Sequence, residues 1–258
     1  MSPVNEVRSP ARRSQPINDE ANLVHNTLLL RTPALLQHII WPTTRLILKF
    51  FTRFRVIGLE NLENLPPGVI FAANHSSEID PIVIPAALPF MSQHFGMFYT
   101  SREQSFYKRS GWRQKFYGGT LFKLWGAYPV KVGVHNYEAS LGEHIRLLEH
   151  HKSVCIFPEG RKTDTGELQE GKGGMIYLAH KTGKPIVPVF IEGVFKLSFL
   201  NFFFMRRRIT VNFGKPLYIG NLLPQPQQLL ITAGHDDCRE GAQKIMTEIK
   251  ALRTHSTA

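Results

Sequence analysis

The sequence predicts an α/β fold: a single domain with a central mixed sheet flanked by helices, preceded by N-terminal amphipathic helices. From residue 56 onward, short apolar runs alternate with amphipathic helical stretches, which is the pattern of strands and helices in one α/β chain. The 258 residues are 43% hydrophobic and 20% charged, which is enough to bury a core and too apolar for a disordered chain. No Pro/Ser-rich linker interrupts the interior, and this favours one domain.

The expected elements follow in chain order. Apolar runs predict strands at 69–73, 154–157, 185–190 and 209–213, and helical periodicity predicts helices from 81 onward and at 137–151, 173–181 and 237–253. Pro185 and Pro188 predict that the third strand is irregular or lies at an edge, because proline cannot donate to a ladder. Residues 1–20 are expected to form a flexible tail, 21–55 an amphipathic helical segment and 56–258 the compact domain.

Charge and cysteine content narrow the class of partner. Lysine and arginine exceed aspartate and glutamate by 31 to 20, so the net charge of +11 points to phosphates, nucleic acid or a lipid surface. Cys155 and Cys238 give neither a disulfide framework nor metal-ligand spacing, which fits a reducing compartment. His144, His150 and His151 lack a third ligand at suitable spacing, so we expect surface histidines and no metal site.

The segment 21–55 mixes leucine, isoleucine and aromatic residues with arginine and lysine, a composition that suits a helix lying in a lipid interface. The alternative is a helix pair that packs on the domain. In either case Pro33 and Pro42 are expected to break the segment into short pieces. The longest stretch without charged residues, 81–101, is interrupted by prolines, so we expect no transmembrane helix.

Two further segments have compositions suited to a lipid surface. The apolar run 197–205 precedes Arg206, Arg207 and Arg208, so apolar insertion beside a basic collar would hold anionic lipid. The segment 101–131 contains seven basic residues and one acidic residue, and aromatic residues alternate with the basic ones. That segment suits a lipid surface, single-stranded nucleic acid, or a solvated basic face over core aromatics.

His75 and Asp80 are the first candidates for chemistry. They lie where the buried strand at 69–73 runs into a helix that starts near Pro81. In a regular helix an offset of five residues would place them roughly 140° apart, so a pair forms only if His75 lies in the turn. A histidine held by an aspartate can act as a general base at neutral pH. The alternative is a structural histidine, with Asp80 capping the following helix.

Four segments occur in one order along the chain. They resemble the four motifs of the glycerolipid acyltransferase family typified by lysophosphatidate acyltransferase: Asn74-His75-Ser76-Ser77-Glu78-Ile79-Asp80, Gly126-Ala127-Tyr128-Pro129-Val130-Lys131, Phe157-Pro158-Glu159-Gly160-Arg161-Lys162 and Pro185-Ile186-Val187-Pro188-Val189. The resemblance covers about 56–213, and its first and third motifs together are quite specific.

The resemblance assigns roles residue by residue. It implies that His75 is the general base on an acceptor hydroxyl and that Asp80 orients it and stabilises the imidazolium, so that the substrate hydroxyl takes the place of the serine in a catalytic triad. It implies that the substrate is bound by Asn74, Lys131, Glu159, Gly160, Arg161 and Lys162. The sequence departs from the family at Lys131, where arginine is usual, and at Arg161-Lys162, where a small residue and arginine are usual. Lysine binds phosphate as a point charge without the bidentate fork.

The resemblance implies an O-acyltransferase of phospholipid biosynthesis. A fatty acyl group would pass from acyl-CoA or acyl-carrier protein to a hydroxyl of a lysophospholipid, in the first instance lysophosphatidate, giving phosphatidate. No cofactor and no metal are expected, and the partners are the donor, the acceptor and an anionic membrane surface, with a peripheral or monotopic place on its cytoplasmic face. Glycerol 3-phosphate or a non-phosphate lysolipid remains an alternative acceptor, and a non-catalytic basic module on membrane or nucleic acid remains an alternative class.

Overall fold

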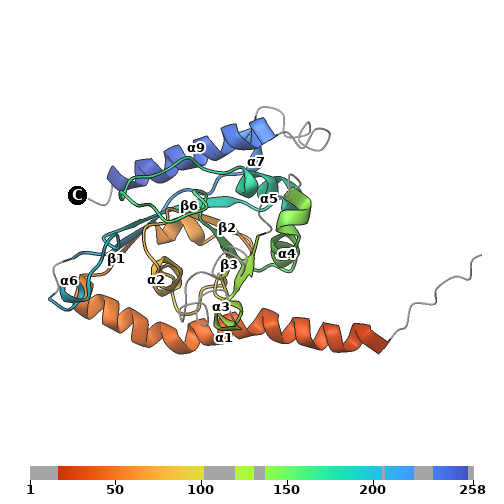
Figure 1. Ribbon diagram of the computed structural model, residues 1–258, viewed down its shortest axis with the longest axis horizontal. Coiled ribbons are helices and arrows are strands. Elements are labelled where there is room, and N and C mark those ends of the chain that lie inside the picture. The colour runs from red at the N-terminus through yellow and green to blue at the C-terminus, as the bar shows by residue number, and fades with distance from the viewer. Residues whose placement is uncertain (1–16, 102–119, 131–136, 205–206, 224–234, 255–258) are drawn as a thin grey trace, which may run out of the picture.

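A seven-stranded mixed sheet forms the centre of the computed structural model, which describes residues 17–101, 120–130, 137–204, 207–223 and 235–254 (Figure 1). The strands are β1 (Arg55–Ile57), β2 (Ile70–Ala73), β3 (Phe98–Ser101), β4 (Ala127–Pro129), β5 (Val154–Ile156), β6 (Ile186–Glu192) and β7 (Thr210–Phe213). Their order is β1-β7-β6-β2-β5-β3-β4, and every pairing is parallel except β6 with β7. The predicted α/β class with a mixed sheet is confirmed.

Helices cover both faces of this sheet. They are α1 (Ile17–Thr52), η1 (Leu59–Leu62), α2 (Asp80–Ala87), α3 (Thr120–Trp125), α4 (Tyr137–Glu149), α5 (Gly174–Thr182), α6 (Phe199–Phe203), α7 (Ile219–Leu222) and α9 (His235–Thr254). Alternate residues of β2 enter opposite cores: Phe71 packs toward α1 and α2, and Ile70 packs toward α4, α5 and α9 (Figure 1). The catalytic candidates follow β2, so they are anchored by the most deeply buried part of the molecule.

The long helix α1 is continuous, so the prediction that Pro33 and Pro42 break it was wrong. An interior proline removes one helical hydrogen bond and costs about 3 kcal/mol or more, but docking on the domain offsets this cost. The buried Gln37 side chain donates from Nε2 to the carbonyl of Met97 at 2.9 Å and accepts from the Met97 N–H at 3.0 Å. One turn further, Trp41 Nε1 donates to Leu88 O at 3.0 Å. Beyond Pro42, Arg45 Nη1 donates to the carbonyl of Ala86 at 2.6 Å, so the helix is held on both sides of this proline.

Strand β6 is central, with β7 on one side and β2 on the other, so the edge position, one of the two predicted alternatives, was wrong. Pro188 is tolerated there because it lies just outside the β7 ladder. The last pair of that ladder joins Val189 to Phe213, and the next residue, Gly214, donates its N–H to the carbonyl of Pro188 at 2.8 Å. The missing proline N–H therefore leaves no β7 carbonyl without a donor.

The outer face of α1 carries exposed apolar side chains on the side opposite Gln37 and Trp41. They are Leu35, Ile39, Leu46 and Phe50, with Ile40 and Ile47 exposed on the flank of the helix. Among the helices that the structure describes, none is long and apolar enough to cross a membrane. The helix therefore packs on the domain along one face and leaves an apolar stripe on the other.

Candidate active site

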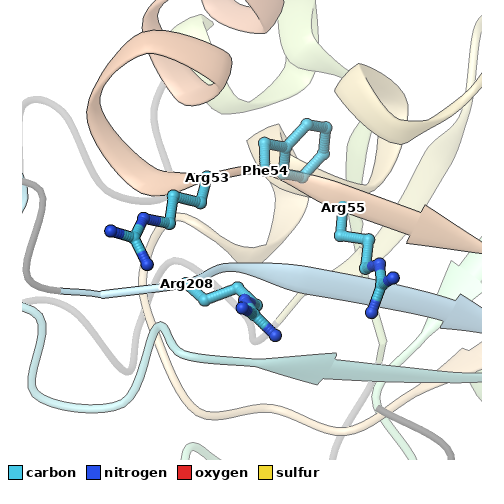
Figure 2. Close-up of a pocket in the computed structure, with 4 residues that line it drawn as sticks. All are labelled: Arg53, Phe54, Arg55 and Arg208. Atoms are coloured by element: carbon cyan, nitrogen blue, oxygen red, sulfur yellow. The ribbon is translucent and has the colours of Figure 1, made fainter. Parts of the chain in front are cut away.

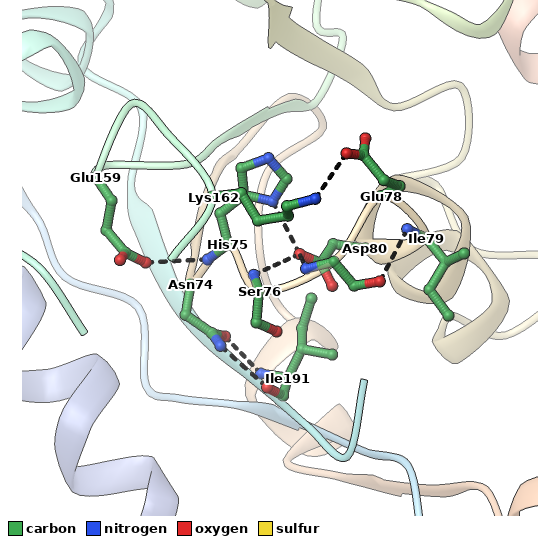
Figure 3. Close-up of polar contacts among 10 residues, drawn as sticks. Asn74, His75, Ser76, Glu78, Ile79, Asp80, Glu159, Lys162 and Ile191 are labelled. Carbon is green, nitrogen blue, oxygen red and sulfur yellow. Dashed lines mark hydrogen bonds and ion pairs between the residues drawn. The ribbon is translucent and has the colours of Figure 1, made fainter. Parts of the chain in front are cut away.

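His75 and Asp80 are brought together by the turn between β2 and α2. His75 Nδ1 lies 2.9 Å from Asp80 Oδ2 (Figure 3). The same carboxylate oxygen accepts the backbone N–H groups of Ser76 and Ser77, each at 2.8 Å. Asp80 is fully buried and stands at the first residue of α2, where the helix N-terminus favours negative charge. The backbone of the turn therefore holds the carboxylate in place independently of its contact with the imidazole.

The imidazole ring is held on its face as well as at Nδ1. It stacks on Phe157, which follows β5, with ring centroids 4.2 Å apart and an interplanar angle of 20°. Because Nδ1 faces Asp80, Nε2 points to the opposite side of the ring (Figure 3). No hydrogen-bond partner for Nε2 occurs in the part of the chain that the structure describes, and the side chain is 21% exposed. The arrangement leaves Nε2 open, which a general base at this position would require.

Glu159 supports the same loop from the neighbouring strand. Its Oε1 accepts the backbone N–H of His75 at 3.0 Å, and its Oε2 accepts the backbone N–H of Gln169 at 3.1 Å. The side chain is buried, and burial raises the pKa of this carboxyl although the two N–H donors favour its charged form. From the same segment Thr163 donates its N–H to the carbonyl of His75 at 2.9 Å. The main chain of His75 is thus clamped on both its polar groups.

We predict that Glu159→Gln weakens both the fold and the site. A glutamine has one oxygen, so one of the two backbone N–H groups at His75 and Gln169 loses its acceptor, at a cost of about 1–3 kcal/mol. In a domain of this size the melting temperature should fall by roughly 2–10 °C, and activity should fall with it because the base loses a positioning contact. The matched control is Glu170→Gln, which removes an exposed carboxylate paired with Arg239 and should change neither. Equal effects of the two substitutions would contradict the clamp.

Asn74 is placed by the backbone of β6. Its side-chain Nδ2 donates to the carbonyl of Ile191 at 3.0 Å and its Oδ1 accepts the N–H of Ile191 at 2.7 Å (Figure 3). The residue is buried, so both of its polar ends are used to join the end of β2 to β6. The contacts that the structure gives Asn74 are those of a positioning residue.

The candidate acceptor residues of the third motif lie around the same loop. Lys162 pairs with Glu78 at 2.8 Å, and Arg161 Nε donates to Gln169 Oε1 at 2.7 Å; both cations are exposed, and Gln169 is half-buried. Gly160 has a φ of +69°, and a Cβ there would lie 2.7 Å from Lys172 Nζ, so the position favours glycine. Lys131 lies outside the described residues. The loop therefore brings two cations to the side of the first motif, and both already have polar partners.

Three groups that support the site could not be predicted from the sequence. The backbone N–H groups of Ser76 and Ser77 hold Asp80, and that of Thr163 holds the carbonyl of His75. Main-chain contacts do not depend on residue type, so no composition or spacing marks them. Phe157 belongs to the third motif, but its stacking under the imidazole is visible only in the structure.

The histidines of α4 and its end occupy different environments. His144 is fully buried, so the expectation of a surface histidine was wrong there, while His150 and His151 are exposed. Burial lowers the pKa of His144 to about 4, so it stays neutral at physiological pH. Within the described part of the chain no group of three histidine, cysteine or acidic side chains is arranged to hold a metal ion.

Comparison with known proteins places this chain in a family. The family model described as Acyltransferase matches residues 53–192, more than half of the chain, and this range includes His75, Asp80 and Glu159. The chain belongs to the acyltransferase family, as the four motifs predicted.

Three relatives are named as 1-acyl-sn-glycerol-3-phosphate acyltransferases. The one from Borreliella burgdorferi is 27% identical over 161 residues, which is 61% of this chain and 56% of that protein. The human beta form is 32% identical over 137 residues, or 53% and 45%. A chloroplastic form of Brassica napus is 25% identical over 148 residues, or 57% and 39%. The chain thus spans about half the length of the curated relatives it matches.

A solved structure shares the architecture. The crystal structure of the 1-acyl-sn-glycerophosphate acyltransferase from Thermotoga maritima aligns with a TM-score of 0.54, covering 93% of this chain and 89% of that one. At 16% identity the match shows a shared fold.

Proposed function

We propose that this protein transfers a fatty acyl group from a thioester donor, acyl-CoA or acyl-carrier protein, to a hydroxyl of a lysophospholipid. Lysophosphatidate is the proposed acceptor and phosphatidate the proposed product. The observation that carries the proposal is the pair of His75 Nδ1 and the buried Asp80 carboxylate, 2.9 Å apart, with Nε2 open on the other side of the ring. The names of the relatives support the acceptor.

The chemistry needs one base and no covalent intermediate. Nε2 of His75 takes the proton of the acceptor hydroxyl as its oxygen attacks the thioester carbonyl, and a new C–O bond forms. The tetrahedral intermediate collapses with cleavage of the C–S bond, and the imidazolium returns its proton to the leaving thiolate. The Asp80 charge stabilises the imidazolium between the two steps. The thioester already carries the activation, so placement of hydroxyl and carbonyl supplies much of the remaining barrier reduction.

We propose that Asn74 and Glu159 position the base. We propose that the cations of the third motif bind the phosphate of the acceptor. Arg161 and Lys162 would exchange their contacts with Gln169 and Glu78 for the phosphate, while Gly160 keeps the loop close to Lys172. Lys131 completes the proposed set from the second motif. An uncharged lysolipid or glycerol 3-phosphate would use the same base with different contacts, so the acceptor has to be measured.

The direct experiment is transfer of labelled acyl from acyl-CoA and from acyl-carrier protein in detergent micelles. The acceptors are lysophosphatidate, glycerol 3-phosphate, lysophosphatidylcholine and lysophosphatidylethanolamine. Phosphatidate formed from lysophosphatidate, at a rate at least roughly tenfold above that of the other acceptors, is the expected result. A clear preference for another acceptor would contradict the phosphate assignment while leaving the reaction class in place. No product with any pair would favour the non-catalytic binding module.

We further propose that the protein works at the cytoplasmic face of a membrane, where both thioester donors are soluble and the acceptor is embedded. The apolar stripe of α1 would lie in the lipid interface. Its members at 35, 39, 46 and 50 recur at helical spacing on the face turned away from the domain, and Arg45 and Trp41 anchor the opposite face to α2.

The double substitution Leu46→Ser/Phe50→Ser tests this docking. Both side chains are more than half exposed, so the melting temperature should stay within about 2 °C of wild type. Binding to phosphatidylcholine vesicles should fall on the order of 100-fold, because each side chain gives up roughly 1.5 kcal/mol or more of burial in lipid. Tyr218→Ser removes an exposed apolar side chain near α7 and serves as the control. Unchanged sedimentation of the double variant would overturn the docking of α1.

A further inference from the structure

A pocket of about 460 Å³ lies where α1 passes into β1, and it is lined by Arg53, Phe54, Arg55 and Arg208. The three guanidinium groups are on one side of the two strands, and the Phe54 ring is on the other side, packed against the core (Figure 2). Phe54 and Arg55 point to opposite sides, as neighbouring residues of an extended chain do, and Arg53 belongs to the turn that ends α1. The pocket therefore presents three positive charges on one surface.

The sheet register brings these arginines together. Arg55 pairs with Thr210 across the parallel ladder of β1 and β7, and Ile209 bonds both to the carbonyl of Thr52 and to the N–H of Arg55. Arg53 and Arg208, each two residues before the first pair of this ladder, therefore both line the pocket at the starts of the two strands. Like charges held close together repel one another. Within the part of the chain that the structure describes, no carboxylate pairs with any of the three, so the cluster lacks a built-in counter-ion.

Arg53 also has an unfavourable backbone. Its φ is +47°, directly after the last residue of α1, where a left-handed residue ends the helix and glycine or asparagine is usual. Arginine gains no conformational advantage there, so a side-chain role is the simpler reason for its presence. A cation does favour the carboxyl terminus of a helix, and the experiment below separates that structural role from binding.

An apolar crest borders the pocket. Helix α6, which precedes Arg208 in the chain, packs on the end of α1 through Phe51, whose ring lies 5.5 Å from Phe202 and 4.8 Å from Phe203. Leu200 and Phe204 of this crest are exposed, as is Phe50 of α1 beside them. Exposed aromatic and aliphatic side chains next to clustered arginines match the depth profile of a membrane surface, with apolar groups below the phosphates.

The pocket shares a sheet edge with the candidate base. Strand β7 is antiparallel to β6, with Thr210 opposite Glu192, so the starts of β7 and β1 lie beside the carboxyl ends of β6 and β2. Three strand steps separate β1 from β2, roughly 14 Å at about 4.8 Å each. A membrane bound at the pocket would therefore face the edge that carries His75.

We propose that Arg53, Arg55 and Arg208 bind the phosphate headgroup of an anionic membrane lipid while α6 inserts its apolar crest, a second membrane contact distinct from the acceptor site. The lipid phosphate supplies the counter-ion that the cluster lacks, and guanidinium groups bind phosphate in bidentate fashion. The inference rests on the membrane docking proposed for α1. The two proposals can be disproved independently, because α1 accounts for binding to neutral vesicles and the arginines account for the preference for charged vesicles.

The experiment compares vesicles of phosphatidylcholine alone with vesicles containing one fifth phosphatidylglycerol, a lipid that is neither acceptor nor product of the proposed reaction. Wild type should prefer the charged vesicles. Arg53→Gln/Arg55→Gln/Arg208→Gln should lower binding to charged vesicles on the order of 100-fold and binding to neutral vesicles less than about twofold. The charge-matched control Arg146→Gln/Lys184→Gln/Lys250→Gln lies on α4, after α5 and on α9, across the sheet from α1, and should lower neither by more than about twofold.

Three results would overturn the proposal. Equal losses in the two triple variants would mean that net charge alone sets the preference. An unchanged preference in the first variant would exclude the pocket. Inorganic phosphate that raises the melting temperature of wild type, but not of the first variant, and abolishes the vesicle preference would show a site for free phosphate.

The single substitution Arg53→Gly separates an effect on binding from an effect on folding. Glycine relieves the left-handed backbone, so the melting temperature should not fall, whereas binding to charged vesicles should fall about fivefold.

Discussion

His75→Ala should lower the turnover number for acyl transfer by roughly 10³-fold or more, leaving little activity above the uncatalysed rate. Alanine has no Nε2, so the variant has no group that can take the proton of the acceptor hydroxyl. The fold should persist, since the ring is partly exposed and Asp80 Oδ2 keeps the N–H donors of Ser76 and Ser77 after the imidazole is gone. Labelled-acyl transfer and thermal melting, measured on the same preparation, check both statements.

The matched control is His150→Ala, which removes an exposed histidine just after α4 and should leave turnover unchanged. Activity of His75→Ala close to that of wild type would eliminate the base mechanism. A large loss of melting temperature would leave the activity result ambiguous, and His75→Gln then keeps a polar side chain near Asp80 and Phe157. Loss of turnover in both variants, with wild-type melting in at least one, is the expected outcome.

The pairing of His75 with Asp80 could be predicted from the sequence because it is local. A buried strand, a turn and a proline-started helix place the two residues within six positions, and helix geometry excludes the pair unless the histidine lies in the turn. The contact of Glu159 with the His75 backbone spans 84 residues. It exists because β2 and β5 are neighbours in the sheet, and strand order is not written in the periodicity of either strand.

The two predictions drawn from proline, breaks in α1 and an edge position for β6, were wrong because tertiary contacts decide both outcomes. The preferences of Pro33 and Pro42 concern an isolated helix, and α1 is held by Gln37, Trp41 and Arg45 along its docked face. Pro188 is compatible with a central strand only because the β7 ladder ends at the Val189–Phe213 pair, so no carbonyl of β7 needs an N–H donor at position 188. Each case depends on what lies opposite the proline, which a single sequence does not specify.

The antiparallel direction of β7 has a functional consequence in the proposed docking. If β7 ran parallel to β6, its start would lie at the opposite edge of the sheet from His75. Because β7 runs antiparallel, Arg208 lies close to the end of β6, at the edge where Asn74 bonds to Ile191. In the proposed docking, the arginine pocket and His75 therefore face the same membrane surface.

Asp80→Asn should lower the turnover number by roughly 30- to 200-fold, a smaller loss than that of His75→Ala, because it removes the charge and keeps the orientation. The N–H groups of Ser76 and Ser77 both point at Oδ2, so only an oxygen fits that position. The asparagine amide oxygen is therefore held there and still accepts from His75 Nδ1–H, which preserves the tautomer. The lost negative charge leaves the imidazolium less stabilised by about 2–3 kcal/mol.

The same geometry predicts a cost in stability. Oδ1 of Asp80 is buried and has no hydrogen-bond partner among the described residues, so the asparagine NH₂ group would be placed there as a buried donor without an acceptor. That costs about 1–3 kcal/mol and should lower the melting temperature by several degrees. Asp80→Ala is the comparison: it leaves both serine N–H groups without an acceptor and frees the imidazole, so its turnover should fall to the level of His75→Ala. Equal turnover in Asp80→Asn and Asp80→Ala would mean that the amide flips and that orientation, rather than charge, is what Asp80 contributes.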